Sequence, residues 1–201
     1  VSTGRLAAVA SSGPRKRTVK PPSDEQLIAD CLGGNERAWA ALIDRYKQLI
    51  YSAPLRYRMS PEDAGDIFQS VCLELYNSLP RLREQGALRG WLATVAAHQC
   101  FHWKRRGRRI EAVNPDLDPE DGVSQPSEVV EQLQREQILR ECVESLSPRC
   151  RQMVHMLFFE DPPLPYAEVA KRLGLATGSI GFIRGRCLEK LRRKLEEAGF
   201  C

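Results

Sequence analysis

With 201 residues, of which 42% are hydrophobic and 28% charged, the chain can bury the core of one large domain or of two small ones. Its apolar runs are too short to span a bilayer and no charged-then-apolar leader opens it, so we expect a cytoplasmic protein without membrane insertion. The formal net charge of +4 is modest, so the placement of the charges is more informative than their sum.

The charges fall in blocks. Residues 1–22 contain five basic residues and no acidic one, and the run KRRGRR at 104–109 holds five cations in six positions. Residues 110–131 then hold seven acids and no Lys or Arg. Such blocks are typical of a protein that binds a polyanion and has a separate acidic connector. The seven cysteines are scattered without a CxxC pair, which predicts reduced, mostly buried thiols.

The N-terminal half of the chain has a helical pattern. Residues 1–22 show no apolar period and are expected to form a disordered basic tail. Helix starts are predicted by capping residues at Ser23 (with Gln26 as its capping-box partner), Asn35 and Ser60, the last followed by Pro61. The third of these helices carries apolar residues at Ile67, Phe68, Val71, Leu75 and Tyr76.

A loop and a fourth helix complete this half. Residues 77–88, NSLPRLREQGAL, are expected to form a loop because Pro80 and Gly86 break helices. The fourth helix is expected from about Arg89 to Arg106, and no stretch alternates like a strand. Residues 23–106 therefore predict an all-α domain of four helices.

The C-terminal half predicts a second small helical domain. Residues 107–127 contain three prolines and a cluster of acids, and are expected to form a flexible acidic linker. Helical signals resume near Glu128, so residues 128–201 form the second domain. Within it, residues 166–194 predict a helix-turn-helix, with Gly174 ending the first helix and Thr177 as the N-cap of the second.

The second helix of this motif has two distinct faces. Ile180, Ile183, Cys187 and Leu191 are spaced as one buried stripe. The opposite face carries three glycines with Phe182 and Arg186. Glycines on an exposed helix face cost stability, up to roughly 1 kcal/mol each. Close approach of this backbone to DNA would offset that cost, although helix-turn-helix units also occur in proteins that never bind DNA.

Three stretches in order resemble bacterial sigma factors. Residues 64–76, AGDIFQSVCLELY, resemble the segment that docks on the RNA polymerase clamp, and residues 88–106, LRGWLATVAAHQCFHWKRR, resemble the segment that opens the promoter. Residues 145–195 resemble the C-terminal helix-turn-helix. Two domains with nothing large between them resemble the extracytoplasmic-function (ECF) group. The resemblance implies an alternative sigma factor that binds core RNA polymerase, through the beta-prime clamp and the beta flap, and directs initiation at −10 and −35 elements.

The resemblance also implies which residues carry each role. Core polymerase binding is expected at Asp63, Asp66, Gln69 and Glu74. Contacts with the −10 element are expected at Asn77, Arg81, Arg83, His98, Lys104, Arg105 and Arg106. Contacts with the −35 element are expected at Ser179, Phe182, Arg184, Arg186 and Lys190. An anti-sigma partner is a further expectation of the family.

Other readings compete with this one. A helix-turn-helix regulator that binds duplex DNA without joining polymerase would explain residues 145–195 but not residues 64–76. His98, Cys100 and His102 include two histidines at a spacing that zinc accepts, but the ligand set is incomplete. With no phosphate loop, nucleophile motif or metal-binding acid cluster, the sequence predicts neither an enzyme nor a cofactor.

Overall fold

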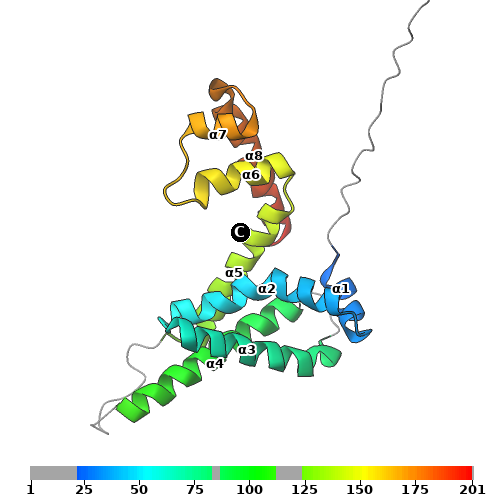
Figure 1. Cartoon of the computed structure of the whole chain (residues 1–201), viewed down its shortest axis with the longest axis vertical. Helices are drawn as coiled ribbons and strands as arrows, with labels where there is room; N and C mark the ends of the chain where they lie inside the picture. The colour runs from blue at the N-terminus through cyan, green and yellow to red at the C-terminus, as the bar shows by residue number, and fades with distance from the viewer. Residues whose placement is uncertain (1–21, 83–86, 112–123, 201) are drawn as a thin grey trace, which may run out of the picture.

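The computed structural model describes residues 22–82, 87–111 and 124–200, and no strand occurs among them. The first group of helices is α1 (Asp24–Leu32), α2 (Glu36–Arg56), α3 (Pro61–Ser78), the 3-10 turn η1 (Leu79–Arg81) and α4 (Ala87–Glu111). The second is α5 (Pro126–Glu144), α6 (Pro148–Phe158), α7 (Tyr166–Leu173), the 3-10 turn η2 (Thr177–Ser179) and α8 (Ile180–Glu197). The all-α prediction is confirmed (Figure 1). Within the described part of the chain, no helix has the length and apolar character needed to cross a membrane.

The predicted helix starts are confirmed by the capping hydrogen bonds. At α1, the Gln26 amide donates to Ser23 Oγ at 3.3 Å and the Ser23 amide donates to Gln26 Oε1 at 3.0 Å, which completes the capping box. Asn35 Oδ1 accepts from the first amides of α2. Ser60 Oγ accepts from the Asp63 amide at 3.1 Å, and Pro61 lies in the first turn of α3.

The expected loop at residues 77–88 is shorter in the structure. Helix α3 continues through Ser78, so Asn77 is helical, and Arg81 lies in η1. Pro80 does not end α3 earlier because it occupies the first turn of η1, where no backbone donor is needed. Arg83 lies outside the described residues. Helix α4 is longer than expected and runs five residues past Arg106, to Glu111.

The first hydrophobic core is built between α1, α2, α3 and α4. Its fully buried side chains include Leu42, Leu49, Val71, Leu75 and Leu92. Tyr76 was expected on the apolar side of α3, and this is wrong: its side chain is 65% exposed. It lies one residue beyond the buried stripe and rests on the Trp39 ring, with ring centroids 5.5 Å apart.

Helix α5 belongs to both hydrophobic cores. Val129 and Leu133, near its start, are buried in the first core, whereas Cys142 and Val143, near its end, are buried in the second. In Figure 1, α5 runs from beside α2 and α4 toward α6 and α8. The acidic connector was expected to end at residue 127, and helix α5 begins at Pro126.

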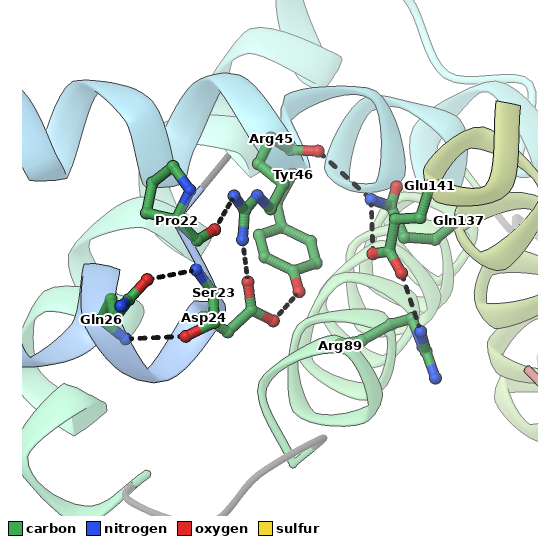
Figure 2. Close-up of polar contacts among 9 residues, drawn as sticks. All are labelled: Pro22, Ser23, Asp24, Gln26, Arg45, Tyr46, Arg89, Gln137 and Glu141. Carbon is green, nitrogen blue, oxygen red and sulfur yellow. Dashed lines mark hydrogen bonds and ion pairs between the residues drawn. The ribbon is translucent and has the colours of Figure 1, made fainter. Parts of the chain in front are cut away.

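Polar contacts hold α5 against the first core (Figure 2). The buried Gln137 amide donates to the main-chain oxygen of Arg45 at 3.3 Å and to Glu141 Oε1 at 3.1 Å. Arg89 in α4 donates to Glu141 Oε2 at 3.1 Å. Arg56 in α2 pairs with Glu136. Because these partners come from α2, α4 and α5, the contacts fix the position of α5 on the first group of helices.

The same close-up shows how the start of the described chain is fixed (Figure 2). Asp24 accepts hydrogen bonds from the Arg45 guanidinium and the Tyr46 hydroxyl, each at 2.5 Å. Burial, reinforced by the bond to Asp24, raises the pKa of Tyr46 well above its ordinary value. Tyr46 therefore stays a neutral hydrogen-bond donor that ties α1 to α2.

The second core contains the predicted helix-turn-helix. Ile180, Cys187 and Leu191 of α8 are buried, and Ile183 packs against them, so the predicted stripe is confirmed. Gly174 ends α7 in the left-handed region, at φ 63°, which glycine adopts without strain. The expected N-cap at Thr177 is wrong: Thr177 opens η2, and α8 begins three residues later without a side-chain cap.

Two cysteines of the second core are joined. Cys150 in α6 and Cys187 in α8 form a disulfide, with their Cα atoms 5.3 Å apart. The scattered spacing had predicted reduced thiols throughout, and for this pair the prediction is wrong. The two residues are 37 positions apart, and only the packing of α6 on α8 brings them together. Cys31, Cys72, Cys100 and Cys142 are free.

Candidate nucleic-acid interface

The outer face of α8 is open. A Cβ atom added at Gly178, Gly181 or Gly185 would meet no heavy atom within 4 Å. Phe182 projects from the same face with 71% of its surface exposed. Because three side chains are missing around one aromatic ring, another surface can approach the backbone of α8 closely here.

Two arginines on this helix are held by aromatic rings. The Arg184 guanidinium donates to the Tyr166 hydroxyl at 2.6 Å and lies 5.9 Å from the centre of that ring. The Arg186 guanidinium lies 5.7 Å from the centre of the Phe182 ring. Such cation–π contacts restrict the arginine side chain without neutralising it. Both arginines are exposed at the surface.

The remaining predicted −35 residues flank this pair. Lys190 is exposed one turn beyond Arg186, and Ser179 is half-buried immediately before α8, where its hydroxyl makes no capping hydrogen bond. Farther along, Glu189 accepts hydrogen bonds from Arg192 and Arg193. These bonds lower the pKa of Glu189 to about 2. The C-terminal turns of α8 therefore carry internal ion pairs, whereas Arg186 and Lys190 lie on the open part of the helix.

A second exposed surface lies on α4. His98, His102 and Arg106 are exposed at intervals of four residues, so they share one face of the helix, and Trp103 is exposed beside them. Lys104 and Arg105 are half-buried instead. Lys104 donates to the main-chain oxygen of Arg58 at 3.3 Å, and the Arg105 guanidinium lies 5.6 Å from the Phe101 ring centre.

The predicted −10 residues are therefore not one continuous patch. Asn77 is exposed near the end of α3, and Arg81 is exposed in η1. His98, His102 and Arg106 of α4 face solvent, whereas Lys104 reaches the main-chain oxygen of Arg58 and Arg105 lies near the Phe101 ring. Sequence spacing alone did not separate the exposed residues of α4 from the half-buried Lys104 and Arg105.

The metal-site alternative has a definite geometry. His98 and His102 face solvent with ring centroids 6.2 Å apart, but Cys100 is fully buried in the first core. Two residues along a helix correspond to a turn of about 200°, so the thiol points away from both histidines. Burial raises the pKa of Cys100 to about 12, which disfavours the thiolate that a metal would need. Among the described residues, no three His, Cys, Asp or Glu side chains are grouped to hold a metal.

Helix α3 carries the predicted polymerase-binding residues. Asp66 and Gln69 are exposed, Asp63 is half-buried in the first turn, and Glu74 accepts from Gln99 of α4 at 2.8 Å. Leu73 was not assigned a binding role, yet its side chain is 66% exposed. A stripe runs along α3 at the spacing of one helix face: Asp66, Gln69, Leu73 and Tyr76. The sequence could have predicted this face of polar and apolar residues, because Leu73 and Tyr76 follow Gln69 at the spacing of one helix face.

Two family models match separate parts of the chain. Residues 42–110 match the family model described as Sigma-70 region 2, and residues 142–193 match that described as Sigma-70, region 4. The RNA polymerase sigma factor YlaC of Bacillus subtilis is 22% identical over 162 residues, which cover 78% of this chain and 91% of the relative. The ECF RNA polymerase sigma factor SigD of Mycobacterium tuberculosis is 22% identical over 210 residues, covering 99% of this chain and 96% of the relative.

Two solved structures are also similar. CnrH in complex with the cytosolic domain of CnrY is 19% identical, with a TM-score of 0.38, and covers 87% of this chain and 97% of that one. The RsbN–BldN complex is 21% identical, with a TM-score of 0.31, and covers 83% of this chain and 97% of that one.

Proposed function

The chain belongs to the ECF group of bacterial sigma factors, and from this premise we propose how its surfaces share the work of starting transcription. A sigma factor binds core RNA polymerase and directs promoter-specific initiation. That task requires no bond-making step by the protein. It requires one surface for the polymerase and two for DNA, one for each promoter element.

Helix α3 is the proposed polymerase-binding surface. Asp66 and Gln69 offer acceptors to a basic partner, and the adjacent Leu73 offers apolar area that the fold leaves in water. Apolar area next to polar groups fits an interface with an apolar core and a polar rim. Asp63 and Glu74, which lie beside the stripe on α3, contribute charge at its rim.

Helix α4, with the end of α3 and η1, is the proposed −10 surface. The exposed stripe of His98, His102 and Arg106 supplies ring faces and a cation to separated strands. Asn77 and Arg81 lie on the segment before α4, where they would contact an extruded base or its phosphates. Lys104 and Arg105 would add charge to the backbone contacts, and Arg83 is proposed from the sequence alone.

The open face of α8 is the proposed −35 surface. Phe182 and Arg186 project where three glycines leave room for the duplex, with Arg184 held in place by Tyr166. Lys190 and Ser179 would contact phosphates at either side. With so few long side chains at the centre of the face, base readout would rest on Phe182 and Arg186 together with groove shape.

The observation that carries this proposal is the presence of both matched regions on one chain, in the order region 2 then region 4. The test is reconstituted transcription with core polymerase and promoters selected from genomic fragments by the resulting holoenzyme. The purified chain should bind core polymerase and produce promoter-specific transcripts. Specific duplex binding without polymerase binding or transcripts would instead establish the alternative, a helix-turn-helix regulator.

Two further expectations follow from this function. The protein would act in the cytoplasm, where polymerase and promoter DNA are found. An inhibitory anti-sigma partner is predicted by the family, and affinity capture with the intact chain as bait would identify it. No cofactor is required for either expectation.

A further inference from the structure

The disulfide lies inside the DNA-binding half of the protein. Cys150 is 6% exposed and Cys187 is 1% exposed, and both belong to the second core. The bond connects α6 to the middle of α8, between the half-buried Ile183 and the buried Leu191. It therefore ties the candidate recognition helix directly to the helix that supports it.

The position of the bond separates it from the outer face of α8. Cys187 belongs to the buried stripe with Ile180 and Leu191, whereas Phe182 and Arg186 project outward. A crosslink on the inner face leaves the proposed DNA-binding side chains uncovered. It also restricts the motion of α8 relative to α6.

Cysteine pairs in reducing compartments are normally thiols, and disulfides found there are usually transient or redox-sensing. A cytoplasmic protein with the proposed function would meet such conditions. We propose that Cys150 and Cys187 form a redox-active dithiol whose oxidation fixes α8 to α6 and stabilises the C-terminal helices in the form that binds DNA. The pairing and its effect on unfolding do not depend on polymerase or DNA binding, whereas the effect on DNA binding rests on the proposed function; the peptide map and the unfolding temperature therefore test the pairing by itself.

The chemistry is thiol–disulfide exchange with a small disulfide such as oxidised glutathione. One cysteine thiolate attacks the small disulfide, which releases one glutathione thiolate and leaves a mixed disulfide on the protein. The second cysteine thiolate attacks the protein-bound sulfur, which forms the Cys150–Cys187 bond and releases the second glutathione. The protein loses two electrons and two protons, and oxidised glutathione becomes two molecules of the reduced form.

Burial sets a condition on this exchange. Neither sulfur is accessible to a tripeptide while α6 and α8 are packed together, because both side chains are almost fully buried. Exchange therefore requires α6 and α8 to separate locally. Once formed, the bond opposes that separation and closes a loop of 37 residues in the unfolded chain.

Four samples of the full-length protein test the proposal: wild type, Cys150→Ala, Cys187→Ala and Cys142→Ala. Each is equilibrated with either oxidised glutathione or dithiothreitol, its free thiols are blocked, and its linked peptides are mapped by mass spectrometry. Thermal unfolding and the binding of a −35 duplex are then followed across temperature. Cys142 is the matched control, because it is a buried free cysteine of the same core.

Oxidised wild type should contain a peptide pair linking Cys150 and Cys187, and its C-terminal helices should unfold on the order of 10 °C higher than in the reduced protein. Cys142→Ala should retain this shift, and both variants of the pair should lose it. Duplex binding by oxidised wild type should persist to higher temperature than by reduced wild type. Absence of the linked peptide pair, linkage through another cysteine, or loss of duplex binding on oxidation would overturn the proposal. If a variant of the pair fails to fold, the wild-type peptide map and temperature shift still decide the outcome.

Discussion

The side-chain amide of Gln137 in α5 donates to the main-chain oxygen of Arg45 in α2 across 3.3 Å, inside the first core. Gln137 is 2% exposed and is the only buried amide side chain among the described residues, none of whose charged side chains is buried. The same nitrogen also donates to Glu141, which accepts from Arg89. One amide thus connects a backbone carbonyl of α2 to an ion pair between α4 and α5.

Replacing this amide should destabilise the docking of α5. We expect Gln137→Ala to lower the free energy of unfolding by about 1–2 kcal/mol, because the Arg45 carbonyl and the Glu141 carboxylate each lose a hydrogen bond in the interior. Gln152→Ala, which changes an exposed glutamine of α6, should be neutral within about 0.5 kcal/mol. Urea unfolding measures both values. Equal stability of the two variants would show that the Gln137 contact does not hold α5.

The exposed leucine of α3 should matter for polymerase and not for folding. Leu73→Ser removes an apolar side chain that is 66% exposed, so the thermal midpoint should change little. Binding to core polymerase should weaken by roughly tenfold or more if Leu73 lies at the interface centre. Leu55→Ser, at an exposed leucine of α2, is the matched control. Fluorescence anisotropy of labelled protein with core polymerase compares them.

Replacing Gly185 by alanine should raise the stability of α8 and lower the affinity for the −35 duplex. Gly185→Ala should stabilise α8 by roughly 0.5–1 kcal/mol, because the added methyl meets open space and alanine favours helix. If DNA approaches the backbone there, affinity for the −35 duplex should fall by roughly threefold to tenfold, or about 1 kcal/mol. Gly65→Ala in α3 should stabilise without changing affinity. Unchanged duplex affinity in Gly185→Ala would place the DNA elsewhere.

The Arg186 guanidinium, proposed to take part in base readout, should contribute to the affinity for the −35 duplex, and the salt dependence of binding shows whether it also contacts a phosphate. Arg186→Ala should weaken binding and, if the contact is to a phosphate, reduce the slope of log affinity against log salt by about one. Binding titrations at four salt concentrations give the slope. Arg149→Ala, at an exposed arginine of α6, should leave it unchanged. A loss of affinity with an unchanged slope would indicate a base contact in place of a phosphate contact.

Because the Cys100 thiol is buried, the free energy of unfolding should fall at high pH. Burial raises its pKa from 9.0 to about 12, so between these values the unfolded chain ionises while the folded chain keeps the proton. The contribution of Cys100 to the free energy of unfolding is therefore constant below pH 9. It falls as the pH rises toward 12, by about 1 kcal/mol at pH 10. Unfolding under reducing conditions at pH 8 and pH 10 measures the loss. Cys100→Ala should show a smaller loss over the same interval.

Local signals predicted the elements well. The capping residues Ser23, Asn35 and Ser60 each specify a helix start through a hydrogen bond to a residue two or three positions away. Gly174 likewise ends α7 through its own backbone conformation. These features depend on neighbours in sequence, so the sequence contains them directly.

Features that depend on packing between distant helices were not predictable in the same way. The pairing of Cys150 with Cys187 and the burial of Gln137 both require knowing which helices meet. The candidate sites show the same limit. The contiguous charge run placed Lys104 and Arg106 together, but only the structure shows that Lys104 donates to the main-chain oxygen of Arg58, which follows α2.

Helix α5 also limits how the two halves of the molecule can move. It is one uninterrupted helix of 19 residues, about 28 Å long, and each of its ends is anchored in a different core. A change in the distance between the α4 and α8 surfaces must break α5, withdraw Cys142 and Val143 from the second core, or withdraw the aliphatic Val129 and Leu133 from the first core. Exposing two such aliphatic side chains costs roughly 3–6 kcal/mol. The distance between the α4 and α8 surfaces therefore cannot change gradually, because any large change first requires the free energy of detaching or breaking α5.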